Sequence, residues 1–263
     1  EAYAKHQQEN EHVILEPGVG FTLVKKLLKL NSKKTPIDVI LLSRNSADTG
    51  LRIFNSIEHY DLNISRAAFT RGESTHPFVG AFEADLFLSS NYNDVQKALQ
   101  SGYAAASIVE SKSNNSHPSQ LRIAFDGDAV IFSDESERIF QEKGLEAFHE
   151  NEILSEKIEL KAGPFKSFLV SLQKIQSTFP EEDNPIRTAL VTARSAPSHR
   201  RVIHTMRKWG IRIDESFFLG GLEKGVFLRQ FAADIFFDDQ QQHCESASQY
   251  VPTGHVPSGI KNS

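Results

Sequence analysis

The chain alternates short, continuous apolar runs with longer segments in which apolar residues recur every three or four positions. Short runs bounded by polar turns are typical of buried strands, and the longer periodic segments are typical of amphipathic helices. Strands that alternate with helices predict an α/β fold, in which helices cover both faces of a parallel sheet. The expected strands are 38–43, 64–70, 84–88, 104–109, 121–125, 186–191, 216–219 and 235–237.

Helical periodicity fills most of the intervals between these strands. One long interval, 134–160, is polar and acidic, so we expect a helical segment that lies outside the core. The polar start of the chain, 1–11, has no apolar period and is expected to be irregular. The other expected helices are near 21–28, 51–57, 95–99, 165–175, 197–209 and 223–231.

The clearest linker by composition is 111–119, with the sequence SKSNNSHPS. It divides the chain into an N-terminal α/β part, 36–118, and a second part, 119–263, with 1–35 as an N-terminal extension. We see no internal repeat.

Reactive side chains follow four of the expected strands in the second part. Because parallel strands end at one edge of a sheet, residues far apart in sequence can meet there. The set suits phosphoryl transfer that a metal ion assists. Its members are Asp126 and Asp128, Thr192, Lys224 within the loop 220–224, and Asp238 with Asp239.

Each type of side chain fits one part of that chemistry. Asp126 would attack phosphorus and form an aspartyl phosphate. Asp128 would protonate the leaving oxygen and later deprotonate the attacking water. Thr192 would donate a hydrogen bond to the phosphate, and Lys224 would offset negative charge.

The acidic pair at the last strand would hold a magnesium ion. Carboxylate oxygens are the ligands that Mg²⁺ prefers. We favour Asp238 over Asp239 as the direct ligand, and the reverse assignment stays open. His243 beside Cys244 does not predict zinc, because no second pair of ligands matches it.

Each of these signals also has a purely structural interpretation. Two aspartates after a strand often cap a helix or form a turn, and Thr192 could be the N-cap of the next helix. Arg194 could contact the substrate, but a surface salt bridge is favoured. The basic residues of the helix after Pro197 are interpreted as a solvated face. The order of all four motifs is what favours catalysis.

Composition limits the classes of function. Of the 263 residues, 39% are hydrophobic, and the net charge of −5 disfavours nucleic acid as a partner. No apolar run is long enough to cross a bilayer, and no signal-peptide pattern is present. The single cysteine, Cys244, fits a reducing compartment, so we expect a cytoplasmic protein.

The four motifs together resemble those of haloacid-dehalogenase-type phosphatases. Longer segments resemble the cytosolic type I 5′-nucleotidases, and this resemblance covers roughly 36–257. Two further segments, SRNSADTGLRIFNSIEHYDL and GYAAASIV, resemble the same family. The segments that carry the motifs are FDGDAVIFSDESERI, PIRTALVTARSA, FFLGGLEKGVFL and IFFDDQ.

The resemblance implies a Rossmann-like core, a small helical cap near 134–162 and an N-terminal α/β extension. It implies magnesium-dependent hydrolysis of nucleoside 5′-monophosphates, with AMP favoured. In this superfamily pattern Asp128 binds the metal through its main-chain carbonyl. Two alternatives stay open: a phosphatase for another small phosphomonoester, and a nucleotide-binding module without turnover.

Residues that contact the nucleoside are less clearly indicated. Asn45, Arg71 and Gly72 lie in loops after the first two expected strands, and Arg138 lies in the expected cap. Turn formation explains each of them equally well. The sequence is compatible with a homo-oligomer but does not determine the oligomeric state.

Overall fold

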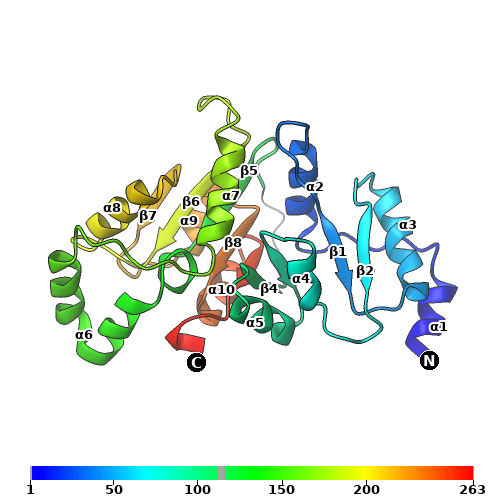
Figure 1. Cartoon of the computed structure of the whole chain (residues 1–263), viewed down its shortest axis with the longest axis horizontal. Helices are drawn as coiled ribbons and strands as arrows, with labels where there is room; N and C mark the ends of the chain where they lie inside the picture. The colour runs from blue at the N-terminus through cyan, green and yellow to red at the C-terminus, as the bar shows by residue number, and fades with distance from the viewer. Residues whose placement is uncertain (1, 112–115, 263) are drawn as a thin grey trace. The chain divides into compact units, whose positions relative to one another are not determined.

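The strands predicted from the apolar runs are all present in a computed structural model of the chain, which describes residues 2–111 and 116–262 (Figure 1). The predicted linker 111–119 therefore lies partly outside the described residues. The chain divides into two compact units, Glu1–Ala84 and Asp85–Ser263. The strands are β1 (Ile40–Ser43), β2 (Arg66–Phe69), β3 (Phe87–Ser89), β4 (Ala105–Val109), β5 (Leu121–Phe125), β6 (Ile186–Thr192), β7 (Glu215–Phe218), β8 (Ile235–Asp238) and β9 (Thr253–His255).

The first unit contains a parallel pair of strands, β1 and β2, with Ile40 opposite Arg66. Its helices are α1 (Ala2–Glu9), α2 (Phe21–Leu30), α3 (Leu51–His59) and α4 (Pro77–Ala81). The expectation that 1–11 is irregular is wrong for α1. This helix has no buried residue. Polar contacts attach the helix to the rest of the first unit: Gln8 Nε2, for example, donates to Asp48 Oδ2 at 2.5 Å. The spacing of apolar residues cannot reveal such contacts.

The second unit contains a seven-stranded sheet in the order β3-β4-β9-β8-β5-β6-β7. The five strands from β9 to β7 are parallel to one another. β3 and β4 run in the opposite direction, because β4 pairs with β9 in antiparallel orientation. The predicted parallel sheet is thus confirmed for its central part. β9 was not predicted, since Thr253–His255 contains no apolar run.

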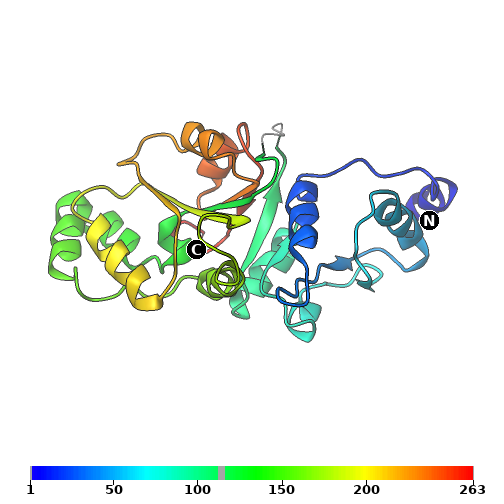
Figure 2. The same ribbon diagram turned by 90° about the horizontal axis from the view of Figure 1, so that it is seen from above.

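Alternate residues of the central strands bury opposite faces of this sheet. On one face, Phe125 and Phe237 stack on each other, and both rings contact Phe165 at the start of α7. On the other face, Ala124 packs in a cluster with residues of α9 and α10. Figure 2 shows α7 and the pair α9 and α10 on opposite sides of the strands. Helices therefore cover both faces, as predicted. The helices of this unit are α5 (Tyr92–Gln100), α6 (Glu135–Leu154), α7 (Lys166–Gln176), α8 (His199–Trp209), α9 (Gly225–Phe231) and α10 (Gln241–Ala247).

A tight helical turn, Gly127–Ile131, leads from β5 toward α6. Within it Ala129 has a φ of 59°, a left-handed conformation directly after the two aspartates. The polar interval 134–160 is helical over Glu135–Leu154, and α6 changes direction at Gly144, where φ is 84°. The expectation that the interval lies outside the core is wrong at Phe148, Glu152 and Leu160, which are buried. Figure 1 shows α6 as two helical segments at the side of the unit. None of the described helices combines the length and the apolar character needed to span a membrane.

Candidate active site

The carboxyl ends of three neighbouring strands meet at one edge of the second unit's sheet. Phe125 of β5 lies opposite Phe237 of β8 on one side and opposite Leu190 of β6 on the other. The residues that follow or end these strands, Asp126, Thr192 and Asp238, are therefore neighbours in space. The prediction that distant motifs share one edge rests on parallel pairing, and the observed register agrees with it.

Lys224 joins two of these strand ends directly. Its Nζ donates to Asp126 Oδ1 at 2.7 Å and to Asp238 Oδ2 at 2.6 Å. All three side chains are buried. Lys224 is the residue before α9, and the next residue must be small: a β-carbon on Gly225 would lie 2.3 Å from the ring of Tyr250.

Thr192 borders the turn that carries the two aspartates. Its Oγ1 lies 3.2 Å from the position that a β-carbon on Gly127 would take, so glycine allows the close approach. Thr192 does not cap α8, whose N-cap is Ser198. Its hydroxyl instead accepts a hydrogen bond from the backbone N–H of Arg194 at 3.2 Å.

The site contains more acid than base. Asp126, Asp238 and Asp239 are three buried carboxyl groups around the single ammonium group of Lys224. Burial and the charge of Asp238 raise the pKa of Asp126 to about 6, although Lys224 acts in the opposite direction. Burial and the charges of both neighbouring aspartates raise the pKa of Asp239 to about 9. For Asp238, Lys224 and His243 outweigh the effect of burial and lower the pKa to about 2.

This donor set fits a divalent cation. One carboxylate oxygen from each of Asp126, Asp238 and Asp239 lies within 4.8 Å of the others. Three oxygen donors and an excess of buried negative charge suit Mg²⁺, which binds carboxylates and keeps some of its water. A cation would also relieve the repulsion that raises the pKa of Asp239. The arrangement therefore supports the predicted metal ligands at these three positions.

Asp128 takes part in a separate ion pair. Arg194 Nε and Nη2 donate to its two carboxylate oxygens at 2.8 and 2.7 Å. The same guanidinium donates through Nη1 to Glu152 Oε2 of α6 at 2.6 Å. The expectation that Arg194 forms a surface salt bridge is wrong, because the Arg194 side chain is only 2% exposed.

Sequence reasoning also missed other members of this network. Glu152 is fully buried and accepts from Ser136 and Arg201 as well. The interpretation of the basic residues on α8 as a solvated face fails at Arg201, which is buried. His243, considered only for zinc, has its Nδ1 3.3 Å from Asp238 Oδ2. No signal in the sequence links Glu152 to Arg194 and Arg201, which lie 42 and 49 positions away.

The residues predicted to contact the nucleoside lie in two places. In the first unit, the loops after β1 and β2 are joined: the backbone N–H of Arg71 donates to the Asn45 carbonyl at 3.1 Å. Gly72 has a φ of 98° in the same turn. Arg138 lies on α6 and forms an exposed pair with Asp134 at 2.9 Å. Their role toward a substrate stays a prediction.

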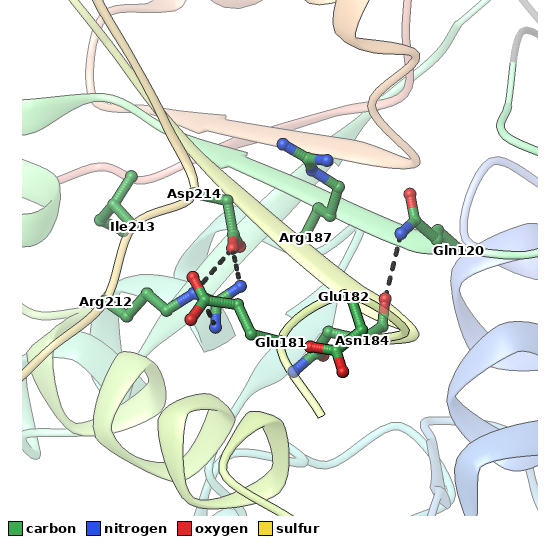
Figure 3. Close-up of a pocket in the computed structure, with 8 residues that line it drawn as sticks. All are labelled: Gln120, Glu181, Glu182, Asn184, Arg187, Arg212, Ile213 and Asp214. Carbon is green, nitrogen blue, oxygen red and sulfur yellow. Dashed lines mark hydrogen bonds and ion pairs between the residues drawn. The ribbon is translucent and has the colours of Figure 1, made fainter. Parts of the chain in front are cut away.

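A cavity of about 320 Å³ lies at the opposite edge of the sheet. Figure 3 shows its lining, which includes Gln120, Asn184 and Asp214, the residues just before β5, β6 and β7. Its two arginines are paired with acids: Arg212 Nε donates to Asp214 at 2.8 Å, and Arg187 Nη2 lies 3.0 Å from Glu215. This cavity is therefore at the amino ends of the strands, away from the reactive residues.

Comparisons with known proteins agree with the geometry. A family model described as 5'-nucleotidase matches residues 1–263. Human (Homo sapiens) Cytosolic 5'-nucleotidase 1B is 40% identical in an alignment that covers 95% of this chain and 43% of that protein. The chain thus spans less than half the length of this relative. No solved structure matches the chain.

The raised pKa of Asp239 predicts how the folding stability of the metal-free protein, kept so by a chelator, depends on pH. Unfolded, this carboxyl group ionises near pH 4, whereas folded it keeps its proton up to about pH 9. The folded state therefore binds more protons between these values, and its stability falls as the pH rises. We expect the melting temperature of the wild type to fall relative to that of Asp239→Asn between pH 5 and pH 9, values within that window. A constant difference across this range would contradict the shift.

Proposed function

Because the chain belongs to the 5'-nucleotidase family, we propose that it hydrolyses nucleoside 5′-monophosphates to nucleoside and phosphate. We further propose that Mg²⁺ is required, that AMP is the favoured substrate and that the protein acts in the cytoplasm. The observation that carries the proposal is the contact of Lys224 with both Asp126 and Asp238. It joins three of the four motifs in one buried cluster at the edge where parallel sheets bind ligands.

In the first step, the Asp126 carboxylate attacks phosphorus and the bond to the nucleoside O5′ breaks. Asp128 gives a proton to O5′, so the nucleoside leaves as a neutral alcohol. Asp126 then carries the phosphoryl group as a mixed anhydride. Thr192 donates a hydrogen bond to a phosphate oxygen, and Lys224 balances the charge of the nucleophile and the phosphate.

In the second step, Asp128 takes a proton from water, and the resulting hydroxide attacks the phosphorus. The bond between phosphorus and the Asp126 oxygen breaks, which releases phosphate and restores the carboxylate. Asp128 holds the proton that the next cycle needs. Lys224 keeps the Asp126 carboxylate in the same place for both steps, since its ammonium contacts Asp126 Oδ1.

Asp126, Asp238 and Asp239 would hold Mg²⁺ through their carboxylates, and Asp128 through its main-chain carbonyl. When bound, the ion would neutralise negative charge on the phosphate and on the buried acids. Within the second unit, the contact proposed to the nucleoside comes from Arg138 of α6. The name of the human relative, a cytosolic 5′-nucleotidase, supports both the substrate class and the location.

A panel of phosphomonoesters tests the substrate class. We expect the wild type to release phosphate from AMP with the highest kcat/KM, followed by IMP and pyrimidine monophosphates. A sugar phosphate should be the poorest substrate, because it lacks the base. Phosphate release is measured at equal substrate concentrations. A sugar phosphate that is hydrolysed faster than every nucleotide would replace this function with that of a more general phosphatase.

Removal of the nucleophile should separate binding from turnover. In Asp126→Asn the side chain keeps its size, but the neutral amide cannot attack phosphorus, so kcat should fall by more than about 1,000-fold. Circular dichroism should show an intact fold. Asp183→Asn, the same change at an exposed site, is the matched control and should keep wild-type turnover. Equal activity of the two variants would refute the role of Asp126.

The proposed metal site predicts selectivity between Mg²⁺ and Ca²⁺. Mg²⁺ requires compact octahedral coordination, whereas Ca²⁺ accepts a larger and looser shell. After removal of metal by a chelator, Mg²⁺ should restore AMP hydrolysis and Ca²⁺ should not. Turnover at similar rates with both ions would contradict a compact site formed by Asp126, Asp238 and Asp239.

A further inference from the structure

Arg194 is held between two carboxylates that come from different elements. Its Nε and Nη2 form two parallel hydrogen bonds with Asp128, and its Nη1 binds Glu152. Arg194 is the second residue after the end of β6, and its guanidinium reaches from the sheet edge to Glu152 of α6. A planar guanidinium with this pattern of donors fixes both the position and the plane of the carboxylate that it binds.

Burial makes this arrangement rigid. The side chains of Arg194 and Glu152 are 2% and 0% exposed, whereas Asp128 is 18% exposed. The guanidinium carbon also lies 5.5 Å from the centre of the Phe148 ring. Glu152 is fixed in turn, since it accepts from Ser136 at 2.8 Å and from Arg201 at 2.9 Å. The buried end of the network is thus anchored, and its partly exposed end is Asp128.

The pairing leaves Asp128 able to exchange a proton. Each carboxylate oxygen has two lone pairs, and each Asp128 oxygen receives one hydrogen bond from Arg194. A second lone pair therefore stays available on each oxygen. The backbone also helps to place the Asp128 carboxylate. Asp128 lies in the tight turn Gly127–Ile131, and the residue after it, Ala129, has a φ of 59°.

We propose that Arg194 is a positioning residue that holds the Asp128 carboxylate in place for proton transfer and ties it to α6 through Glu152. This inference rests on the proposed function, in which Asp128 exchanges protons with the leaving oxygen and with water. Arg194 acts through Asp128 and not on the nucleotide itself. Asp128 and Glu152 take three of the five N–H donors of its guanidinium, and the Arg194 side chain is only 2% exposed.

The first test compares two buried arginines that share one partner. Arg194→Lys keeps the charge but cannot form two parallel hydrogen bonds with Asp128. We expect kcat for AMP to fall by roughly 10–100-fold, while KM changes by less than about threefold. Arg201→Lys is the matched control, because Arg201 also binds Glu152 but donates its other hydrogen bonds to Glu135 and to the Ile158 carbonyl. It should lower the melting temperature but keep kcat within about threefold of the wild type.

The second test shows whether Arg194 acts through Asp128. Asp128→Asn alone should lower kcat by about 100- to 10,000-fold. Adding Arg194→Lys to it should cause almost no further loss, because the group to be positioned is already gone. Losses that multiply in the double variant would show that Arg194 acts on the substrate independently and would overturn the proposal. A raised KM with an unchanged kcat in Arg194→Lys would also overturn the proposal. This single-variant comparison decides the matter where the double variant is too slow to measure.

Folding is checked by circular dichroism and thermal melting of each variant. If Arg194→Lys does not fold, Arg194→Gln takes its place, since its amide still donates to one carboxylate. Failure of both to fold, with Arg201→Lys folded, would mark Arg194 as a structural residue and overturn the positioning role. An inactive wild type would overturn the proposed function together with this role. An active wild type with multiplicative losses would overturn the role of Arg194 alone.

Discussion

Repulsion between buried carboxylates is the constraint around which the second unit is arranged. The direct pairing of β5 with β8 brings Asp126 and Asp238 together, and Asp239 follows on the same edge. Burying such charges without compensation is strongly unfavourable. Lys224 compensates for part of them, and the loop that delivers it turns through Gly220 and Gly221, with φ values of 60° and 91°. The remaining imbalance is what makes the cluster suited to a cation.

The parts of the site that sequence could predict are those that depend on strand order alone. Asp126, Thr192 and Asp238 each end an apolar strand, and parallel pairing is enough to bring them together. Lys224 is different, because its contacts with Asp126 and Asp238 depend on the conformation of a loop. Its position between glycines still indicated that it lies in such a loop. Strand β9, which has no apolar run, and the polar helix α1 could not be found by periodicity.

Buried ion pairs were the largest gap in what the sequence could predict. Glu152 lies in a polar helix, and Arg201 lies among basic residues, so both looked like solvated surface. Their burial follows from each other and from Arg194, since each charge is taken out of water together with its partner. Such pairs are long-range and leave no periodic signal, and the wrong surface assignment of Arg194 has the same cause. The reactive residues at the strand ends were therefore easier to predict than the buried ion pairs that hold them in place.

Strand β9 also affects the order in which the sheet can be completed during synthesis. In the described chain, β3 and β4 reach the other strands only through β9, because β4 pairs with β3 and β9 and β9 pairs with β8. Thr253–His255 leaves the ribosome after Ala105–Val109 and after the whole of the intervening chain, 110–252. At about 5–20 residues per second, this delay is roughly 7–30 s. The edge of β4 that β9 later covers stays unpaired for this whole interval, and the facing edge of β8 stays unpaired from its own synthesis until β9 follows. Unpaired strand edges can pair with other chains, so the nascent protein is prone to aggregate until β9 is added.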